Sequence, residues 1–271
     1  MKIFFKYIGI LSFAMFSFYY TDRVIELSRV NDSIMVSIIE YSKENDTKCR
    51  EGYITDDGIV LGISGILVDK QKSYSNMKGI GYKKDLIEYK KSECILNKEN
   101  NYDKYILKGN PLKNSVSLVI AVDSLDYIDE INDIAKSKGA LLSYMMNSNF
   151  LENNKDVLKK FYDNNFLFNG SNKEEYKKFT RILKSYNKDY SLFCAEYKSN
   201  ILGVCADEEV NTIKVKDIIN MSLLSNIKRS INKGDIIFIN ENRFNAEELS
   251  SAINYINGLG INIVGLNELL D

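Results

Sequence analysis

The sequence predicts an α/β protein whose main domain is a parallel sheet or a closed barrel. Strand-like and helix-like segments alternate over about 155 residues of the C-terminal part, which is typical of repeated βα units. The run VSLVIAV at 116–122 is apolar almost throughout, as in a strand that is covered on both faces. The chain has 271 residues, of which 45% are hydrophobic and 27% charged, so it is long enough for one large and one small domain.

The first 21 residues have the pattern of a secretory signal or signal anchor. Lys2 and Lys6 precede an apolar run at 7–20, and no clear small-x-small cleavage site follows it. The run is shorter than the ~20 residues of a comfortable membrane span, although residues 3–5 extend it. We expect an uncleaved anchor at 1–21, with a single-pass membrane location and the C-terminal body outside the cytoplasm. A cleaved signal on a secreted protein and a buried N-terminal helix are the alternatives.

Residues 22–110 are predicted to form a small α+β, β-rich domain. The segment RVIEL favours a strand, and SIMVSIIEYSKEN has helical apolar spacing. The stretch GYITDDGIVLGISGILVDKQKSY carries short β-rich runs that are broken by turn residues, which indicates hairpins. The polar segment KENNYDKYILKGNPLKNS holds the single proline, Pro111, and predicts the domain boundary near residue 110.

The remaining residues, 111–271, are predicted to form the main domain. Its helix at 127–138 places Ile128, Ile131 and Ile134 on one face. By the same criteria, the other helices are predicted at 153–162, 173–186, 223–232 and 246–257. The strands are predicted at 116–122, 140–146, 166–168, 190–194, 201–205, 210–215, 236–239 and 261–264. Because no G-x-G-x-x-G or P-loop opens a helix, a nucleotide site has no support.

Composition excludes several classes of function. The 36 basic and 37 acidic residues are dispersed, with a net charge of −1, so no basic patch indicates nucleic-acid binding. The chain has no histidine, which excludes Ser-His-Asp triads, Cys-His proteases and HExxH zinc sites. The four cysteines, Cys49, Cys94, Cys194 and Cys205, suit two disulfides, 49–94 and 194–205, or buried free thiols. The sequence alone cannot choose among the connectivities.

Two long segments of the main domain resemble the polysaccharide deacetylase (NodB-homology) family of carbohydrate esterases, family 4. VSLVIAVDSLDYIDEINDIAKSKGALLSYMM is similar to the family opening, in which a strand ends in T-F-D-D-G and a helix leads to the next strand. NKGDIIFINENRFNAEELSSAINYINGLGINIVGLNELL is similar to the family close, with its G-x-I-I-L-x-H strand. The resemblance spans about residues 116–270 and implies a distorted (β/α) barrel of the NodB type. It also implies that SGILVDKQKSYSNMK belongs to a module found ahead of such domains in Gram-positive bacteria.

Enzymes of this family hold a divalent metal with an Asp and two His, and use a second Asp as base and a late His as acid. The metal activates the water that attacks the acetamide carbonyl. The resemblance implies that Asp123 takes the position of the base, while Ser124 replaces the metal-binding Asp. Asn240 replaces the late His.

The second and third family motifs are also altered. In FLFNGSNKEEY, Ser171 falls near the first His position and Glu175 or Tyr176 near the second. LFCAEY aligns with R-x-P-x-G but has neither Arg nor Pro. Because a serine is a poor metal ligand and an asparagine cannot deliver a proton at neutral pH, we expect a degenerate, catalytically inactive domain without metal or cofactor.

The remnant groove would then be formed by Ser124, Asp126, Ser171, Glu175 and Glu241. Asp123 and Asp126 either bind a hard cation, or Ser124 or Asp126 caps the following helix, with Asp129, Glu130 and Asp133 as the acidic residues favoured near a helix start. The lip at 240–243 either hydrogen-bonds sugar hydroxyls or is a solvated loop.

Three functions remain open at this point. The first is a membrane-anchored pseudoenzyme that binds cell-envelope glycan or a protein. The second is an active deacetylase or other hydrolase with a rearranged site at Asp123, Asp126, Glu175 and Glu241. The third is an envelope scaffold without a ligand. No partner of nucleic-acid or nucleotide type is expected.

Overall fold

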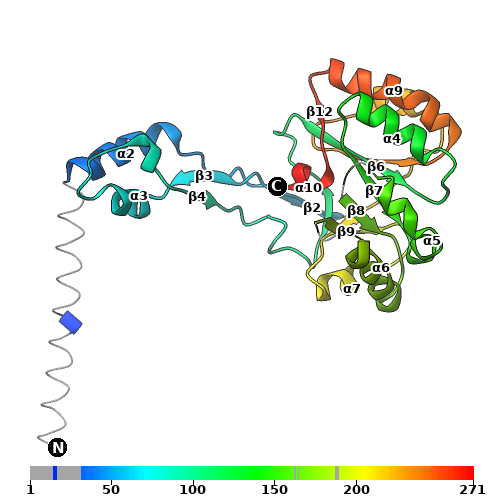
Figure 1. The fold of residues 1–271 in the computed structure, drawn as a ribbon, viewed down its shortest axis with the longest axis horizontal. Helices are drawn as coiled ribbons and strands as arrows, with labels where there is room; N and C mark the ends of the chain where they lie inside the picture. The colour runs from blue at the N-terminus through cyan, green and yellow to red at the C-terminus, as the bar shows by residue number, and fades with distance from the viewer. Residues whose placement is uncertain (1–14, 17–31, 162, 164, 187–188) are drawn as a thin grey trace, which may run out of the picture. The chain divides into compact units, whose positions relative to one another are not determined.

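The computed structural model describes residues 15–16, 32–161, 163, 165–186 and 189–271 (Figure 1). The chain forms two compact units, one of residues 1–49 and 65–92, the other of residues 50–64 and 93–271. The sequence prediction grouped all of 22–110 in one N-terminal domain. Residues 50–64 and 93–110 instead lie in the second unit, because two of their strands, at 58–60 and 105–108, pair within its sheet.

The smaller unit has a two-stranded antiparallel sheet and a compact apolar core. Asp32 caps its first helix by accepting a hydrogen bond from Ile34 N at 2.8 Å, and its second carboxylate oxygen accepts one from Tyr74 Oη at 3.0 Å. Its core consists of Met35, Ile38, Val68, Tyr74, Met77 and Ile87. The elements are α2 (Ser33–Asn45), β3 (Gly65–Val68), α3 (Lys70–Met77), η1 (Lys84–Leu86) and β4 (Tyr89–Ser92). The strand predicted for RVIEL falls outside the described residues.

The larger unit is built on one curled, mostly parallel sheet. Among the described residues its order is β1-β2-β5-β10-β9-β8-β7-β6-β11, and β12 pairs with β6. The ladder leaves β1 and β11 as edges, so the sheet is a curled half-barrel and not a closed barrel. Its strands are β1 (Tyr53–Thr55), β2 (Gly58–Val60), β5 (Tyr105–Lys108), β6 (Ser115–Ala121), β7 (Leu142–Met146), β8 (Asn165–Phe168), β9 (Ser191–Glu196), β10 (Thr212–Lys214), β11 (Ile236–Asn240) and β12 (Asn262–Ile263).

Both faces of this sheet are buried, which explains the continuous apolar runs of its strands. In β6, Leu118 and Ile120 contribute to the core under the helices, whereas Val119 and Ala121 contribute to the core inside the curl. Strands β7, β8, β9 and β10 contribute further side chains to the inner core, and so does the last helix. The inner core includes Ile106, Val119, Met145, Leu167, Phe193, Ala195, Ile213, Phe238, Leu266, Leu269 and Leu270.

Helices cover the outer face of the sheet. In Figure 1 α4 and α9 run together over β6, while α5 and α6 cover the β7–β8 side. These helices are α4 (Ile128–Ser137), α5 (Ser148–Asn153), η2 (Lys155–Lys159), α6 (Lys173–Tyr186), α7 (Leu202–Asp207), α8 (Leu223–Ser230) and α9 (Arg243–Gly258). The last helix, α10 (Leu266–Leu270), packs in the inner core.

Two element predictions are wrong. The apolar run 201–205 was predicted to be a strand, but Leu202 to Asp207 form α7, whose Cys205 is bonded to Cys194 of β9. The helix predicted at 153–162 begins earlier, because Asn147 caps α5 by accepting a hydrogen bond from Phe150 N at 2.8 Å. It is followed by the short 3₁₀ helix η2.

The predicted single-pass membrane location needs correction. Across the described residues, no helix is both long enough and apolar enough to cross a bilayer. The segment on which that prediction rested, residues 1–21, lies outside the described residues except for Met15 and Phe16.

Candidate functional site

The residues predicted from the family pattern lie where strands of the sheet end. Asp123 and Ser124 follow β6, Ser171 follows β8, and Asn240 is the last residue of β11. The strands are parallel and Asn240 is in register with Ala121, so these positions share the carboxyl edge of the sheet. Ligand sites of α/β proteins are commonly found at this edge.

Glu241 is buried and is used to hold the loop after β6. Its side chain is 3% exposed, and its own backbone N–H donates to Ala121 O at 3.1 Å. One carboxylate oxygen accepts a hydrogen bond from the Ser124 hydroxyl, and the other accepts one from Tyr127 N. A buried carboxylate is stable only when such donors surround it. The predicted groove residues Ser124 and Glu241 are thus brought together, but as a structural pair.

Asp123 and Asp126 are both exposed at the surface of this loop. The Ser124 hydroxyl also accepts a hydrogen bond from Asp126 N at 3.3 Å, so it organises the turn and does not cap α4. In the part of the chain that the structure describes, the carboxylate of Asp123 has no hydrogen bond or ion pair. Further along α4, Asp129 pairs with Lys160 at 2.6 Å.

Ser171 and Glu175 contact each other and begin α6. Glu175 accepts hydrogen bonds from Ser171 N at 2.9 Å and from its hydroxyl at 3.4 Å. Asn172 Oδ1 in turn accepts from Glu175 N at 3.0 Å. Asn172 therefore accepts from an N–H group of the first turn of α6, while Glu175 holds the residue that precedes Asn172. No hydrogen bond or ion pair among the described residues joins this pair to Ser124 and Glu241.

The lip after β11 is held by asparagines, one of which the sequence prediction missed. Asn242 caps α9 by accepting from Asn245 N at 3.0 Å. Asn245 is 1% exposed, and its amide donates to Ile219 O at 2.7 Å and Asn240 O at 2.8 Å. By contrast, the half-buried side-chain amide of Asn240 has no partner among the described residues. Asn240 is the predicted lip residue whose polar group is available to a ligand.

A second polar pair, which the sequence prediction also missed, lies at the end of β9. Tyr105 Oη donates to Glu196 Oε1 at 2.6 Å, and Ile201 N donates to Glu196 Oε2 at 3.1 Å. Burial, together with the carboxylate of Glu196, raises the pKa of Tyr105 to about 12. In the sequence, Glu196 could have been found as a carboxylate residue directly after a predicted strand. No sequence pattern indicated Tyr105, because its segment was interpreted as a polar domain boundary.

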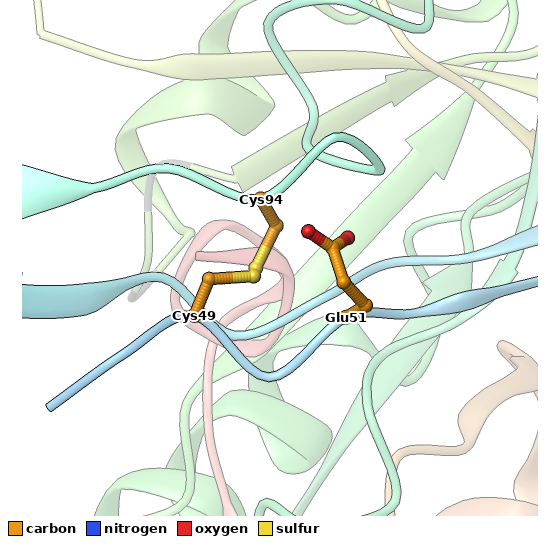
Figure 2. A group of neighbouring side chains, drawn as sticks. All are labelled: Cys49, Glu51 and Cys94. Carbon is orange, nitrogen blue, oxygen red and sulfur yellow. The ribbon is translucent and has the colours of Figure 1, made fainter.

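All four cysteines are oxidised. Cys194 in β9 bonds Cys205 in α7, with a Cα–Cα distance of 6.5 Å. Cys49 and Cys94 are also disulfide-bonded. Figure 2 shows them beside Glu51, with the three potential ligand atoms within 4.8 Å of one another. In this oxidised form the sulfurs are not thiolates, so the group does not have the donors of a metal site.

Comparison with solved structures identifies the fold. A CE4 family pseudoenzyme from Bacillus anthracis is 18% identical, with a TM-score of 0.63, over 89% of this chain and 96% of the other. A mutant of that pseudoenzyme with restored enzymatic activity aligns with 17% identity and the same TM-score over 89% of this chain and 98% of its own. PdaA from Bacillus subtilis, a family 4 carbohydrate esterase, aligns with 13% identity and a TM-score of 0.52 over 64% of this chain and 86% of PdaA.

No family model matches the sequence, and no curated protein matches it. At these identities the structural likeness establishes the fold. The resemblance predicted from the residues is confirmed at that level: the larger unit has the curled half-barrel of the family 4 polysaccharide deacetylases. This chain has the fold of the NodB-like deacetylase domains, and its sequence contains no histidine.

Proposed function

We propose that this protein is a catalytically inactive deacetylase-like protein that binds N-acetylated glycan of the peptidoglycan type. The observation that carries the proposal is the use of Glu241. Its buried carboxylate accepts hydrogen bonds from the Ser124 hydroxyl and from Tyr127 N, so it is not directed at a substrate. In the family pattern Ser124 occupies the position of a metal-binding Asp, and its hydroxyl donates a hydrogen bond to the Glu241 carboxylate.

The alternative of an active hydrolase with a rearranged carboxylate site is weaker for the same physical reason. Such a site would need Asp123, Asp126, Glu175 and Glu241 to act on one substrate. Glu175 instead accepts a hydrogen bond from Ser171 N at the start of α6, and Glu241 is buried and accepts one from the Ser124 hydroxyl. Asn240, at the position of the family's acid, can donate a hydrogen bond but cannot transfer a proton at neutral pH.

The polar groups that remain available suit recognition of sugar hydroxyl and acetamide groups. Asp123 is exposed and unpaired among the described residues, and the Asn240 amide offers both a donor and an acceptor. Among the proteins with this fold are a CE4 family pseudoenzyme and a peptidoglycan N-acetylglucosamine deacetylase, the latter at a TM-score of 0.50. These likenesses motivate the choice of ligand.

A sedimentation assay with insoluble peptidoglycan tests the binding. The full chain should co-sediment with peptidoglycan, and soluble N-acetylated chitooligosaccharides should compete. The double variant Asp123→Asn/Asn240→Ala should bind at least about tenfold more weakly, which corresponds to about 1.4 kcal/mol. The matched control Asp133→Asn alters an acidic residue of α4 away from the strand ends. Equal sedimentation of all three proteins would refute the proposed site, and a wild-type protein that stays in solution would favour a scaffold.

A further inference from the structure

The larger unit contains a cavity of about 510 Å³ that none of the predicted site residues lines. Its walls come from β1, β2 and β5 on one side and from α8 and β11 on the other. The segment after β10 lies between them. The lining residues are Tyr53, Thr55, Val60, Leu107, Lys108, Lys214, Lys216, Asp217, Ile219, Asn226, Arg229, Ser230, Asp235, Ile236, Ile237 and Phe238.

Four of the lining side chains are cationic, and they are poorly neutralised. Lys214 and Lys216 share the single carboxylate of Asp57, at 3.8 and 3.3 Å. Lys108 is half-buried and forms no ion pair within the described part of the chain. Among the described residues, the guanidinium of Arg229 donates only to the amide oxygen of Asn226, at 2.9 Å on its own helix. Half-burial of an unpaired lysine is unfavourable, so a negative ligand here would be strongly attracted.

The two carboxylates that line the cavity do not balance this charge. Asp235 accepts a hydrogen bond from Asn232 N at 2.7 Å, and burial raises the pKa of its carboxyl group, while the charge of Lys108 acts in the opposite direction. Asp217 is exposed and accepts from Ile218 N at 2.9 Å. The floor is apolar, with Val60, Ile237 and Phe238, so the cavity also offers a surface to a ligand body.

We propose that this cavity binds a phosphate-bearing small molecule of sugar-phosphate size. A phosphate monoester carries between one and two negative charges at neutral pH and three acceptor oxygens. It therefore matches several cations that converge from β5, the segment after β10, and α8. Arginine and lysine are the side chains that bind phosphate best, and the volume lies within the range of small-molecule sites. The site is separate from the proposed glycan site at Asp123 and Asn240.

Isothermal titration calorimetry of the full chain tests this site with three probes. These are inorganic phosphate, glucose 6-phosphate and glucose. Both phosphate probes should bind and glucose should not. The variants Lys108→Gln and Arg229→Gln should each raise Kd at least about tenfold, whereas Lys136→Gln, an exposed lysine on α4, should leave it unchanged. The variant Asp235→Asn should lower Kd, because it removes a half-buried carboxylate from the lining of the cavity.

The probes also identify the source of the phosphate group. Tighter binding of glucose 6-phosphate than of inorganic phosphate supports a phosphosugar, and equal binding supports the free anion at the same cations. The proposal is overturned if the wild-type protein binds neither phosphate probe at millimolar concentration. It is also overturned if Lys108→Gln, with an unchanged far-UV circular dichroism spectrum and Tm, binds them as the wild type does.

Discussion

The hydrogen bond between Ser124 and Glu241 makes a sharp prediction about the restoration of a family-like metal site. The natural first step in such a restoration is Ser124→Asp, which would supply the family's metal-binding carboxylate. Here that change replaces the hydroxyl donor to a carboxylate that is 3% exposed. The result is two carboxylates at hydrogen-bonding distance in a buried position.

The magnitude follows from two contributions. Two like charges about 4 Å apart repel by about 4 kcal/mol at an effective dielectric constant of about 20. The lost hydrogen bond to a charged group removes about 1.5–3 kcal/mol more, and relaxation of the exposed loop returns part of the sum. We therefore expect Ser124→Asp to lower the free energy of unfolding by about 3–5 kcal/mol, the range measured when a buried charge loses its partner.

Urea denaturation at neutral pH measures this in a double-mutant cycle. Ser124→Ala should cost about 1–3 kcal/mol, since it only removes the donor. The variant Ser124→Asp/Glu241→Gln should regain at least about 2 kcal/mol, because the new amide can donate to Asp and still accept from Tyr127 N. The control Ser251→Asp, at an exposed position of α9, should stay within about 0.5 kcal/mol of the wild type. The reasoning would be refuted if Ser124→Asp were no less stable than Ser124→Ala. It would also be refuted if adding Glu241→Gln to Ser124→Asp restored none of the lost free energy of unfolding.

Three further predictions follow from other contacts. The pKa of Tyr105 in the fold, about 12, lies above its ordinary value of 10.0, so the bound proton stabilises the fold. That contribution is full below pH 10 and is lost as the pH rises through 12. Ultraviolet difference titration against Tyr105→Phe should show the late ionisation, and Glu196→Gln should move it to lower pH. Replacing Cys194 and Cys205, 11 residues apart, by Ala should cost about 2–3 kcal/mol, and the untreated protein should show no free thiol. Asn245→Ala should cost about 1–3 kcal/mol by removing two hydrogen bonds from a buried amide to the backbone carbonyls of Ile219 and Asn240, whereas exposed Asn257→Ala should cost less than about 0.5 kcal/mol.

The strands and helices of the larger unit were predictable where the apolar pattern reflects two buried faces. The run VSLVIAV becomes β6 because its alternate side chains enter both the inner and the outer core. The run at 201–205 has the same local character, yet it forms α7. Such a short run does not distinguish a strand from a helix. In the structure two contacts with the end of β9 hold the segment: the Glu196 carboxylate accepts from Ile201 N, and Cys205 is bonded to Cys194.

The domain organisation was harder to predict because it depends on pairing across the chain. The segment around Tyr105 looks like a polar linker in sequence, but Ile106 is fully buried and in register with Ile213 of β10 and Ile59 of β2. Parallel pairs between such distant segments leave no local trace in sequence. The same applies to Glu241, which looks like an exposed lip residue. Its two donors lie 117 and 114 residues away along the chain.

Release of acetate by the purified full chain tests the account's central claim most directly. The assay supplies zinc and an N-acetylated chitooligosaccharide or peptidoglycan, and metal content is measured on the same sample. The account predicts acetate at the level of the protein-free control and no stoichiometric metal, because serine and asparagine occupy the positions of ligand and acid. Stoichiometric zinc with turnover that Asp123→Asn abolishes would contradict it.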